Sequence, residues 1–312
     1  MQTTAVVLQR PEHLVLAQLD LTAPTQGDVV VEIDWSGIST GTERLLWSGR
    51  MPHFPGMGYP LVPGYESVGR IIAAEGEHSE RIGEMVFVPG ARCFGDVRGL
   101  FGGAARRLVV PAARALRISE ELSEKGVLFA LAATAHHVIS SVGAQLPDLI
   151  VGHGVLGRML ARIVVARGAG PTVWETNPDR RAGSHAYAVI DPATDERRDY
   201  KTICDVSGAG ELLDGLIGRL APGGEIVLAG FYDEPLGFAF APAFMREARI
   251  RVAAQWAEGD LAAVKQMVED GSLSLDDLIT HRHAATDADQ AYRTAFGDPN
   301  GLKMILDWRQ AA

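Results

Sequence analysis

The residues whose types and spacing most clearly suggest chemistry form a glycine-rich turn near the middle of the chain. The turn has the pattern GxGxxG, with the apolar run 149–151 before it and a helical pattern of apolar residues after it. The first glycine permits a tight turn, the second lets the backbone approach a pyrophosphate, and the third lets the helix pack on the strand. The helix start also favours a bound phosphate. This pattern predicts a dinucleotide site at Gly152, His153, Gly154, Val155, Leu156 and Gly157.

The residues after the next apolar run indicate which dinucleotide is bound. Glu175 lies 23 residues after Gly152, near the spacing of about 20 for the acid that binds the ribose diol. A carboxylate there repels a 2′-phosphate, so the sequence favours NAD over NADP. Arg180 and Arg181 follow closely and leave NADP open.

Alternating strands and helices must position this turn, and residues from 119 onward have that pattern. A helix is expected over 121–142, and strand and helix patterns alternate up to residue 254, which predicts a doubly wound parallel sheet. Ligands of such sheets lie beyond the carboxyl ends of the strands. We therefore expect one crevice lined by Gly152, Glu175, Ser207, Gly208, Gly230 and Phe231. The expected strands are 149–153, 172–175, 187–190, 202–206, 223–231 and 249–254, and the helices are 156–168 and 210–220.

The first 120 residues have a different pattern, of short strands separated by Pro, Gly and Asp, which predicts a small, strongly bent β-barrel. The segment 45–63 is rich in aromatic residues, Met, Gly and Pro, and is expected to be a stiff loop. The tail from Gly259 is expected to complete the first domain. The predicted domains are 1–123 with 257–312, and 124–256. The strands are expected at 4–8, 14–19, 28–35, 67–73, 85–89 and 107–111.

Composition excludes several classes of function. The 312 residues carry a net charge of −10 and contain no basic tract, which argues against a nucleic-acid partner. No run approaches the roughly 18 apolar residues of a membrane span, and no secretory signal is recognisable. The two cysteines, Cys93 and Cys204, are too few for a structural zinc site of four cysteines. We expect a cytoplasmic protein.

Several longer phrases resemble the medium-chain dehydrogenase/reductase superfamily over essentially the full length. They include GISTGTE, PGYESVG, FGGAARRLVV and VGHGVLG. The resemblance implies a GroES-like β-barrel catalytic domain and a Rossmann domain, hence an α/β fold. WSGISTGTERLLWSGRMPHFPGMGYPLVPGYESVG, VRGLFGGAA, APGGEIVLAGFY and LKMILDWR resemble a branch of that superfamily. Members of this branch oxidise the 3-(1-hydroxyethyl) group of a magnesium tetrapyrrole, a bacteriochlorophyllide, to 3-acetyl with NAD⁺.

The chain departs from this superfamily at the positions that hold catalytic zinc. Ser39 replaces the cysteine, Tyr65 replaces the histidine and Ala130 replaces the third ligand. A hydroxyl, a phenol and a methyl do not supply the ligands that Zn²⁺ requires, so the sequence predicts metal-free chemistry. A site that uses Glu43, Glu66 or His136 is the remaining alternative.

Without a metal, a side chain must accept the alcohol proton as the hydride leaves. The resemblance points to Tyr65, as a hydrogen-bond donor or as a base if a cation lowers its pKa from about 10. Glu66 either tunes Tyr65 or is a buried acid paired with an arginine. A hydroxyl relay can form from Ser39, Thr40 and Thr42.

Substrate residues are sought in the apolar loop and near it. Large side chains there either form a wall for a flat chlorin ring or fill the core; they are Trp47, Met51, Phe54, Met57 and Tyr59. Arg44 can bind a carboxylate, and His53 either binds magnesium or lies at the surface. His136 and His137 point about 100° apart on a helix, so one of them faces the cleft or both pack internally.

The resemblance adds two cofactor residues and leaves three functions open. It implies that the Phe231 N–H holds the carboxamide and that Lys303 approaches the pyrophosphate, unless Lys303 is a solvated charge. Asp205 is expected to cap a strand end. The alternatives to alcohol oxidation are a zinc-independent NAD(P)H quinone or enoyl reductase and a pigment carrier without activity. By analogy, a homodimer is expected through the edge of the nucleotide sheet.

Overall fold

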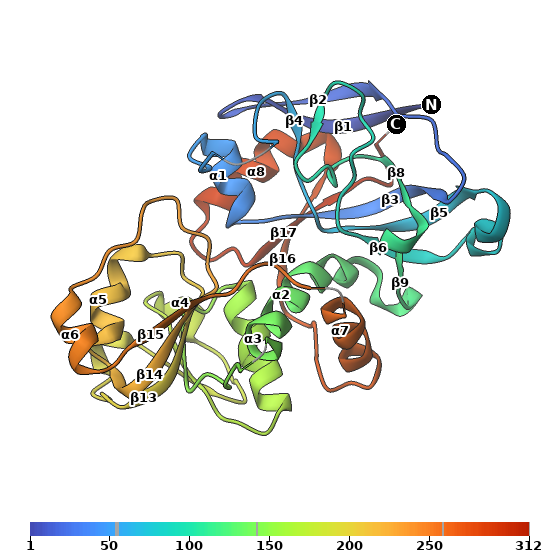
Figure 1. Cartoon of the computed structure of the whole chain (residues 1–312). Coiled ribbons are helices and arrows are strands. Elements are labelled where there is room, and N and C mark those ends of the chain that lie inside the picture. Colours follow the sequence, from blue (N-terminus) through green and yellow to red (C-terminus); the bar gives the residue numbers. More distant parts are fainter. Residues whose placement is uncertain (54–55, 142, 258, 312) are drawn as a thin grey trace. The chain divides into compact units, whose positions relative to one another are not determined.

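The computed structural model describes residues 1–312 except 54–55, 142, 258 and 312. The chain falls into two compact units (Figure 1). Unit 1 comprises residues 1–130 and 276–312, and unit 2 comprises residues 131–275. The functional boundaries expected at 123/124 and 256/257 stay a prediction. Within the described residues, no helix is both long and apolar enough to cross a bilayer.

Unit 1 is built from two β-sheets. One has the strand order β2-β1-β4-β7, and the other has the order β16-β17-β3-β5-β6-β9, with β8 also paired to β3. Val31 of β3 pairs with Ile71 of β5, and both side chains belong to the core. The six strands expected in the first 120 residues all form. The bounds are β1 (Gln2–Arg10), β2 (His13–Asp20), β3 (Asp28–Ile38), β4 (Leu61–Val62), β5 (Ser67–Ala74), β6 (Met85–Val88), β7 (Arg98–Gly99), β8 (Arg107–Pro111), β9 (Leu116–Arg117), β16 (Ile279–Ala284) and β17 (Lys303–Asp307).

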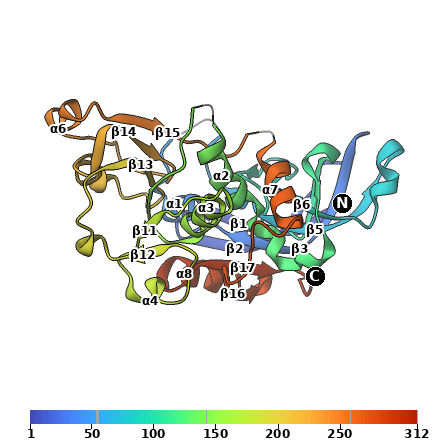
Figure 2. The same cartoon turned by 90° about the horizontal axis from the view of Figure 1, so that it is seen from below.

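Three segments of unit 1 differ from the sequence expectation. Helix α1 (Thr42–Ser48) includes the first residues of the expected loop, because Leu45 and Leu46 bury one side of it and Gly49, at φ 74°, ends it. Residues 120–128 form 3₁₀ turns with a kink at Ser123 instead of a regular helix. Strand β16 was not predicted because its central residues, THRH, are polar. Helix α8 (Ala288–Gly297) packs near β17 (Figure 2).

Unit 2 contains a six-stranded parallel sheet of order β12-β11-β10-β13-β14-β15. Helices α5 and α6 lie on the side of the sheet away from α2 and α3 (Figure 1), which is the doubly wound arrangement that the sequence predicted. Helix α7 belongs to this unit, so the tail rejoins unit 1 at residue 276. The bounds are α2 (Phe129–Ser140), β10 (Leu149–Val151), α3 (Val155–Ala166), β11 (Thr172–Trp174), α4 (Pro178–Arg181), β12 (Ala188–Ile190), β13 (Tyr200–Asp205), α5 (Leu213–Ile217), β14 (Leu220–Leu228), α6 (Phe240–Met245), β15 (Arg249–Val252) and α7 (Asp260–Glu269).

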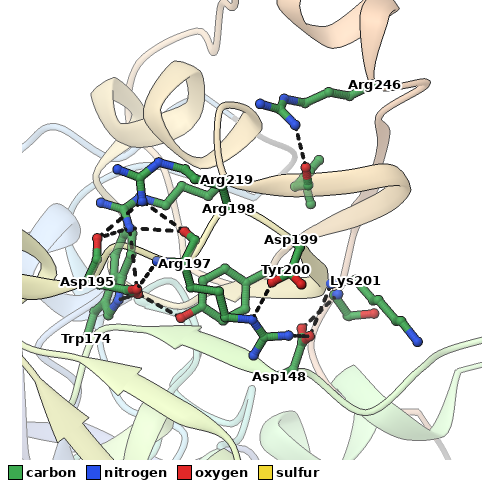
Figure 3. A network of polar contacts seen from close by, with 12 residues as sticks. Asp148, Trp174, Asp195, Arg197, Arg198, Asp199, Tyr200, Lys201, Arg219 and Arg246 are labelled. Carbon is green, nitrogen blue, oxygen red and sulfur yellow. Dashed lines mark hydrogen bonds and ion pairs between the residues drawn. The ribbon is translucent and has the colours of Figure 1, made fainter.

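A polar network joins β11 to the segment before β13 (Figure 3). The Asp195 carboxylate accepts hydrogen bonds from Trp174 Nε1 and from the Tyr200 hydroxyl, both at 2.7 Å, and Arg219 lies 3.5 Å away. Burial raises the pKa of Asp195, but the hydrogen bonds outweigh burial and leave that pKa below its ordinary value. The carboxylate is therefore ionised at neutral pH and stabilises this side of the sheet.

Replacing Tyr200 by Phe should lower the free energy of unfolding by about 2 kcal/mol, because a buried charged hydrogen bond is lost. Urea unfolding at pH 7 measures the loss. A group whose folded pKa is lowered stabilises above its ordinary pKa and loses that effect as the pH falls. The difference between wild type and Tyr200→Phe should therefore shrink below the ordinary Asp value of 3.8. Equal urea midpoints at pH 7 would contradict the assigned role.

Candidate active site

The glycine turn between β10 and α3 has the backbone shape that a dinucleotide requires. Gly152 adopts φ 105°, a left-handed conformation that favours glycine. A Cβ on Gly157 would lie 1.9 Å from the Gly152 carbonyl oxygen, whereas one on Gly154 would meet nothing within 4 Å. Helix α3 starts after Gly154 with no side-chain cap on its first N–H groups. These features fit the pyrophosphate of NAD.

The side chain of His153 points away from this role and supports the turn from behind. Its Nδ1 lies 2.9 Å from the Arg180 carbonyl oxygen and its Nε2 lies 3.0 Å from the Tyr187 hydroxyl. Burial, together with the nearby Arg158 charge, lowers the pKa of His153 to about 4. The imidazole is therefore neutral at pH 7, and only its backbone is available to the cofactor.

Glu175 directly follows β11, at the place expected for the acid that binds a ribose. One of its carboxylate oxygens accepts a hydrogen bond from the Asn177 N–H at 2.8 Å. Arg181 donates to the carbonyl oxygens of Glu175 and Thr176 at 2.9 and 2.7 Å and pairs with Asp191 at 3.1 Å. The guanidinium of Arg181 is thus committed within the protein, which favours a diol over a 2′-phosphate.

The remaining cofactor candidates of unit 2 come directly after strands whose carboxyl ends lie level with one another in the sheet. Val151 of β10 pairs with Trp174 of β11 and with Asp205 of β13, and Asp205 pairs with Leu228 of β14. The Asp205 carboxylate accepts from both the N–H and the hydroxyl of Ser207, at 2.9 and 2.6 Å, so it caps the strand end as expected. The parallel register brings together the residues after these strands, which are Gly152, Glu175, Ser207, Gly208, Gly230 and Phe231.

Unit 1 contains a buried ion pair that the sequence did not predict. The Lys303 amine lies 2.6 and 2.9 Å from the two Glu66 oxygens and 3.2 Å from the Ile38 carbonyl oxygen. Lys303 is 1% exposed and Glu66 is 0% exposed. The assignment of Lys303 to the pyrophosphate was therefore wrong, as was its alternative of a solvated charge. Glu66 is a buried acid, as one of the two alternatives predicted, but its partner is a lysine and not an arginine.

Tyr65 follows a glycine turn that fixes its backbone. Gly64 adopts φ 93°, and its carbonyl oxygen accepts from the Gly103 N–H at 2.8 Å. The Tyr65 hydroxyl donates to Ser39 Oγ at 2.7 Å, and its ring meets Phe101 edge to face. Burial and the Glu66 charge raise the pKa of Tyr65, while hydrogen bonds with Ser39 and Thr42 oppose the rise. The phenol therefore stays protonated at neutral pH, which argues against a phenolate base.

The other hydroxyl candidates separate into two groups. Ser39 is buried beside Tyr65, and Thr42 also hydrogen-bonds to Tyr65. Thr40 and Arg44 are exposed and take no part in this contact, so a relay through Thr40 is not supported.

The sequence analysis missed two functional candidates of unit 1. It named Glu43 only as a possible metal ligand and not as a group that accepts a proton, and it did not name Tyr292. The Tyr292 hydroxyl donates to Glu43 Oε2 at 2.7 Å, and the Ser39 N–H donates to Glu43 Oε1 at 3.2 Å. No local pattern indicates this pair, because its members lie 249 residues apart.

The apolar loop packs largely inward. Met51 is buried in the core, Trp47 stacks obliquely on Phe296 at 5.5 Å, and the Tyr59 hydroxyl donates to the Leu46 carbonyl oxygen. These contacts support the interpretation that Met51 fills the core. Trp47 and Tyr59 are partly exposed. His53 lies at the surface, and Phe54 lies outside the described residues.

The assignment of His136 to the substrate is corrected by its contacts in unit 2. His136 Nδ1 lies 2.6 Å from Asp260 Oδ1, and His137 Nδ1 lies 2.8 Å from Asp260 Oδ2. Ser140 and the Ala257 N–H also donate to this carboxylate. Both neighbouring histidines therefore reach one buried carboxyl and hold α7 on α2.

The residues at the superfamily's zinc positions do not fit that metal. Ser39 and Tyr65 hydrogen-bond to each other, and Ala130 is buried, whereas Zn²⁺ requires nitrogen, sulfur or carboxylate ligands. Among the described residues, no group of three or more His, Cys, Asp or Glu side chains is arranged to hold a metal ion. Metal-free chemistry stays a prediction.

The two sheets of unit 1 and the glycine turn on the parallel sheet of unit 2 define a class, the medium-chain alcohol dehydrogenases. Residues 25–120 match the Alcohol dehydrogenase GroES-like domain. An alcohol dehydrogenase from Escherichia coli CFT073, solved with NADH, has a TM-score of 0.83 at 21% identity, covering 98% of this chain and 99% of its own. At that identity the likeness concerns the fold.

The sequence comparison identifies the family within this class. The 2-desacetyl-2-hydroxyethyl bacteriochlorophyllide A dehydrogenases of Cereibacter sphaeroides and Rhodobacter capsulatus are both 56% identical to this chain, with 100% of each chain covered. The chain belongs to the family of these two dehydrogenases, and it is an oxidoreductase that acts on CH–OH groups.

Replacing Lys303 by Met should lower the free energy of unfolding by about 3–5 kcal/mol, because Glu66 is then buried without its cation. The double variant Lys303→Met/Glu66→Gln should be less destabilised than Lys303→Met alone, since it removes both charges. Urea unfolding of the wild type, of Lys303→Met, of Glu66→Gln and of the double variant measures both effects. A double variant that loses the sum of the two single losses would contradict a coupled ion pair.

Proposed function

We propose that this chain oxidises the hydroxyethyl side chain of a bacteriochlorophyllide, a magnesium tetrapyrrole, to an acetyl group with NAD⁺. The observation that carries this proposal is the 56% identity, over full length, to two dehydrogenases named for that pigment. The glycine turn of unit 2 supports it because its backbone fits a pyrophosphate. The hydroxyl pair of unit 1 supports it because an alcohol must lose a proton in the reaction.

In this proposal, residues of unit 2 bind the cofactor and residues of unit 1 move the alcohol proton. The bound NAD⁺ supplies the hydride acceptor. The turn 152–157 holds the pyrophosphate, Glu175 binds the ribose diol and the Phe231 N–H holds the carboxamide. Tyr65 binds the substrate oxygen: its lone pair accepts from the alcohol while its own proton is donated to Ser39. This orientation lets the alcohol proton leave without a metal.

The substrate is expected to contact residues of unit 1 that keep exposed atoms. Trp47 and Tyr59 are partly exposed and offer aromatic faces to a flat ring. Arg44 is exposed on α1, and its guanidinium suits a carboxylate of the substrate.

Purified protein should convert 3-hydroxyethyl bacteriochlorophyllide to the 3-acetyl pigment with NAD⁺, seen as a red shift of the pigment absorption and as NADH formation. Replacing Tyr65 by Phe should lower kcat by about 100-fold or more and change pigment binding little. Tyr200→Phe, which removes a tyrosine hydroxyl in unit 2, should keep wild-type turnover. An unaltered kcat in Tyr65→Phe would remove Tyr65 from the proton step, and tight pigment binding without turnover in the wild type would indicate a carrier.

We also propose a homodimer formed through β15. This strand ends the sheet order of unit 2, so one of its edges has no neighbour within the sheet. Val252 on β15 is 75% exposed, and Phe240 and Met245 on α6 are 72% and 77% exposed. Apolar side chains this exposed beside an open strand edge suit pairing with a second copy of the same edge.

Light scattering should give twice the mass of 33.4 kDa for the wild type. Val252→Lys should give the monomer, because a charge at the buried centre of the interface opposes pairing. Ile82→Lys, a matched change at an exposed apolar residue of unit 1, should keep the dimer. A monomeric wild type at micromolar concentration would contradict this proposal.

A further inference from the structure

Glu43 is a buried acid, and neither cofactor binding nor the contact of Tyr65 with the substrate gives it a function. Its carboxyl group is 0% exposed, and it accepts hydrogen bonds from two neutral donors, the Tyr292 hydroxyl on α8 and the Ser39 N–H. The buried Lys303 amine on β17 is bonded to the other buried carboxyl of unit 1, Glu66. A buried carboxyl held only by neutral donors is costly to ionise.

Burial, more than the charges around Glu43, moves its pKa toward neutral pH. Burial raises the pKa of Glu43 to about 8, the Glu66 charge adds to the rise, and the Tyr292 and Ser39 hydrogen bonds and the Lys303 charge oppose it. The groups that face it are therefore Tyr292 from α8, Lys303 from β17, Glu66 from the turn before β5 and Ser39 after β3. A carboxyl in this state can take up or release a proton near pH 8.

Ser39 joins Glu43 to Tyr65. Its hydroxyl accepts from Tyr65 at 2.7 Å, and its backbone N–H donates to Glu43 at 3.2 Å. Thr42, the residue before Glu43, also hydrogen-bonds to Tyr65. The Ser39 hydroxyl still has its own proton to donate, and rotation about the Cβ–Oγ bond redirects that proton while Oγ keeps its contact with Tyr65.

We propose that Glu43 receives the proton released by the alcohol, by way of Tyr65 and Ser39, while Tyr292 holds its carboxylate in place. The inference rests on the proposed function. In the step, the substrate O–H bond breaks and its proton moves to Tyr65 Oη, the Tyr65 proton moves to Ser39 Oγ, and the Ser39 proton moves to Glu43. The C–H bond breaks with its electron pair, which leaves as hydride to NAD⁺. The products are the ketone, NADH and protonated Glu43, which later releases its proton to solvent.

The pH dependence of kcat/KM tests this role, because a merely structural carboxyl would not set it. In the wild type, kcat/KM should rise with pH through an apparent pKa near 8, since only ionised Glu43 accepts a proton. Glu43→Gln keeps the shape but cannot titrate, so it should lower kcat/KM at pH 8.5 by about 100-fold and abolish this rise. A Glu43→Gln variant with wild-type rates and the same pH profile would overturn the inference.

A second variant keeps the Glu43 carboxyl, so it tests the inference even if Glu43→Gln does not fold. Tyr292→Phe removes a donor that stabilises the ionised form, so the apparent pKa should move upward from the wild-type value. Tyr200→Phe loses the same hydroxyl from the buried Tyr–Asp pair in unit 2 and should leave the apparent pKa in place. An unshifted profile in Tyr292→Phe would also overturn the inference.

Carboxyl titration of the free enzyme separates this inference from the proposed function. Infrared spectra of protein with ¹³C-labelled glutamate should show a protonated carboxyl that is lost near pH 8 in the wild type and is missing in Glu43→Gln. Absence of this signal from the wild type would overturn the inference even if the pigment is oxidised. A wild type that shows the signal but does not oxidise the pigment would overturn the proposed function, and this proton step with it.

Discussion

Unit 1 buries two carboxyl groups, Glu43 and Glu66, but among its described residues only one buried ammonium group, that of Lys303. Lys303 bonds to both oxygens of Glu66, so Glu43 is left with neutral donors. Because a buried charge without a counter-charge is costly, one carboxyl of the pair is held close to its protonated state at neutral pH.

The same imbalance explains why Tyr65 is suited to donate rather than to act as a phenolate. A base would need a neighbouring cation, and the nearby charges that act on Tyr65 are those of Glu66 and Glu43. A neutral phenol that donates to Ser39 can still accept the alcohol proton, provided that its own proton moves on at the same time. Acid–base chemistry in unit 1 therefore depends on where a proton can go, whereas binding in unit 2 depends on backbone shape. There, the close contact of Gly157 with the Gly152 carbonyl oxygen leaves no room for a side chain.

The sequence predicted what local patterns determine. Six strands of unit 1, the parallel sheet of unit 2 and the glycine turn each follow from residue spacing, and the aligned strand ends follow from the topology. The partners of buried charges could not be predicted in this way. Lys303 meets Glu66 across 237 residues and His136 meets Asp260 across 124, and no periodicity links such positions. Helix α1 was partly missed because the Gly- and Pro-rich residues after Ser48 obscured a short helix with two buried leucines.

The central claim is that oxygen-bearing side chains carry the alcohol proton away as the hydride leaves. The most direct test is the solvent isotope effect on the hydride-transfer step, measured by stopped flow with NAD⁺ and the hydroxyethyl pigment in mixtures of H₂O and D₂O. Hydride transfer should be slower in D₂O and should depend on the deuterium fraction along a curve, since several protons move together. A transfer rate that is independent of solvent deuterium, while deuterium on the reacting carbon still slows it, would contradict the account.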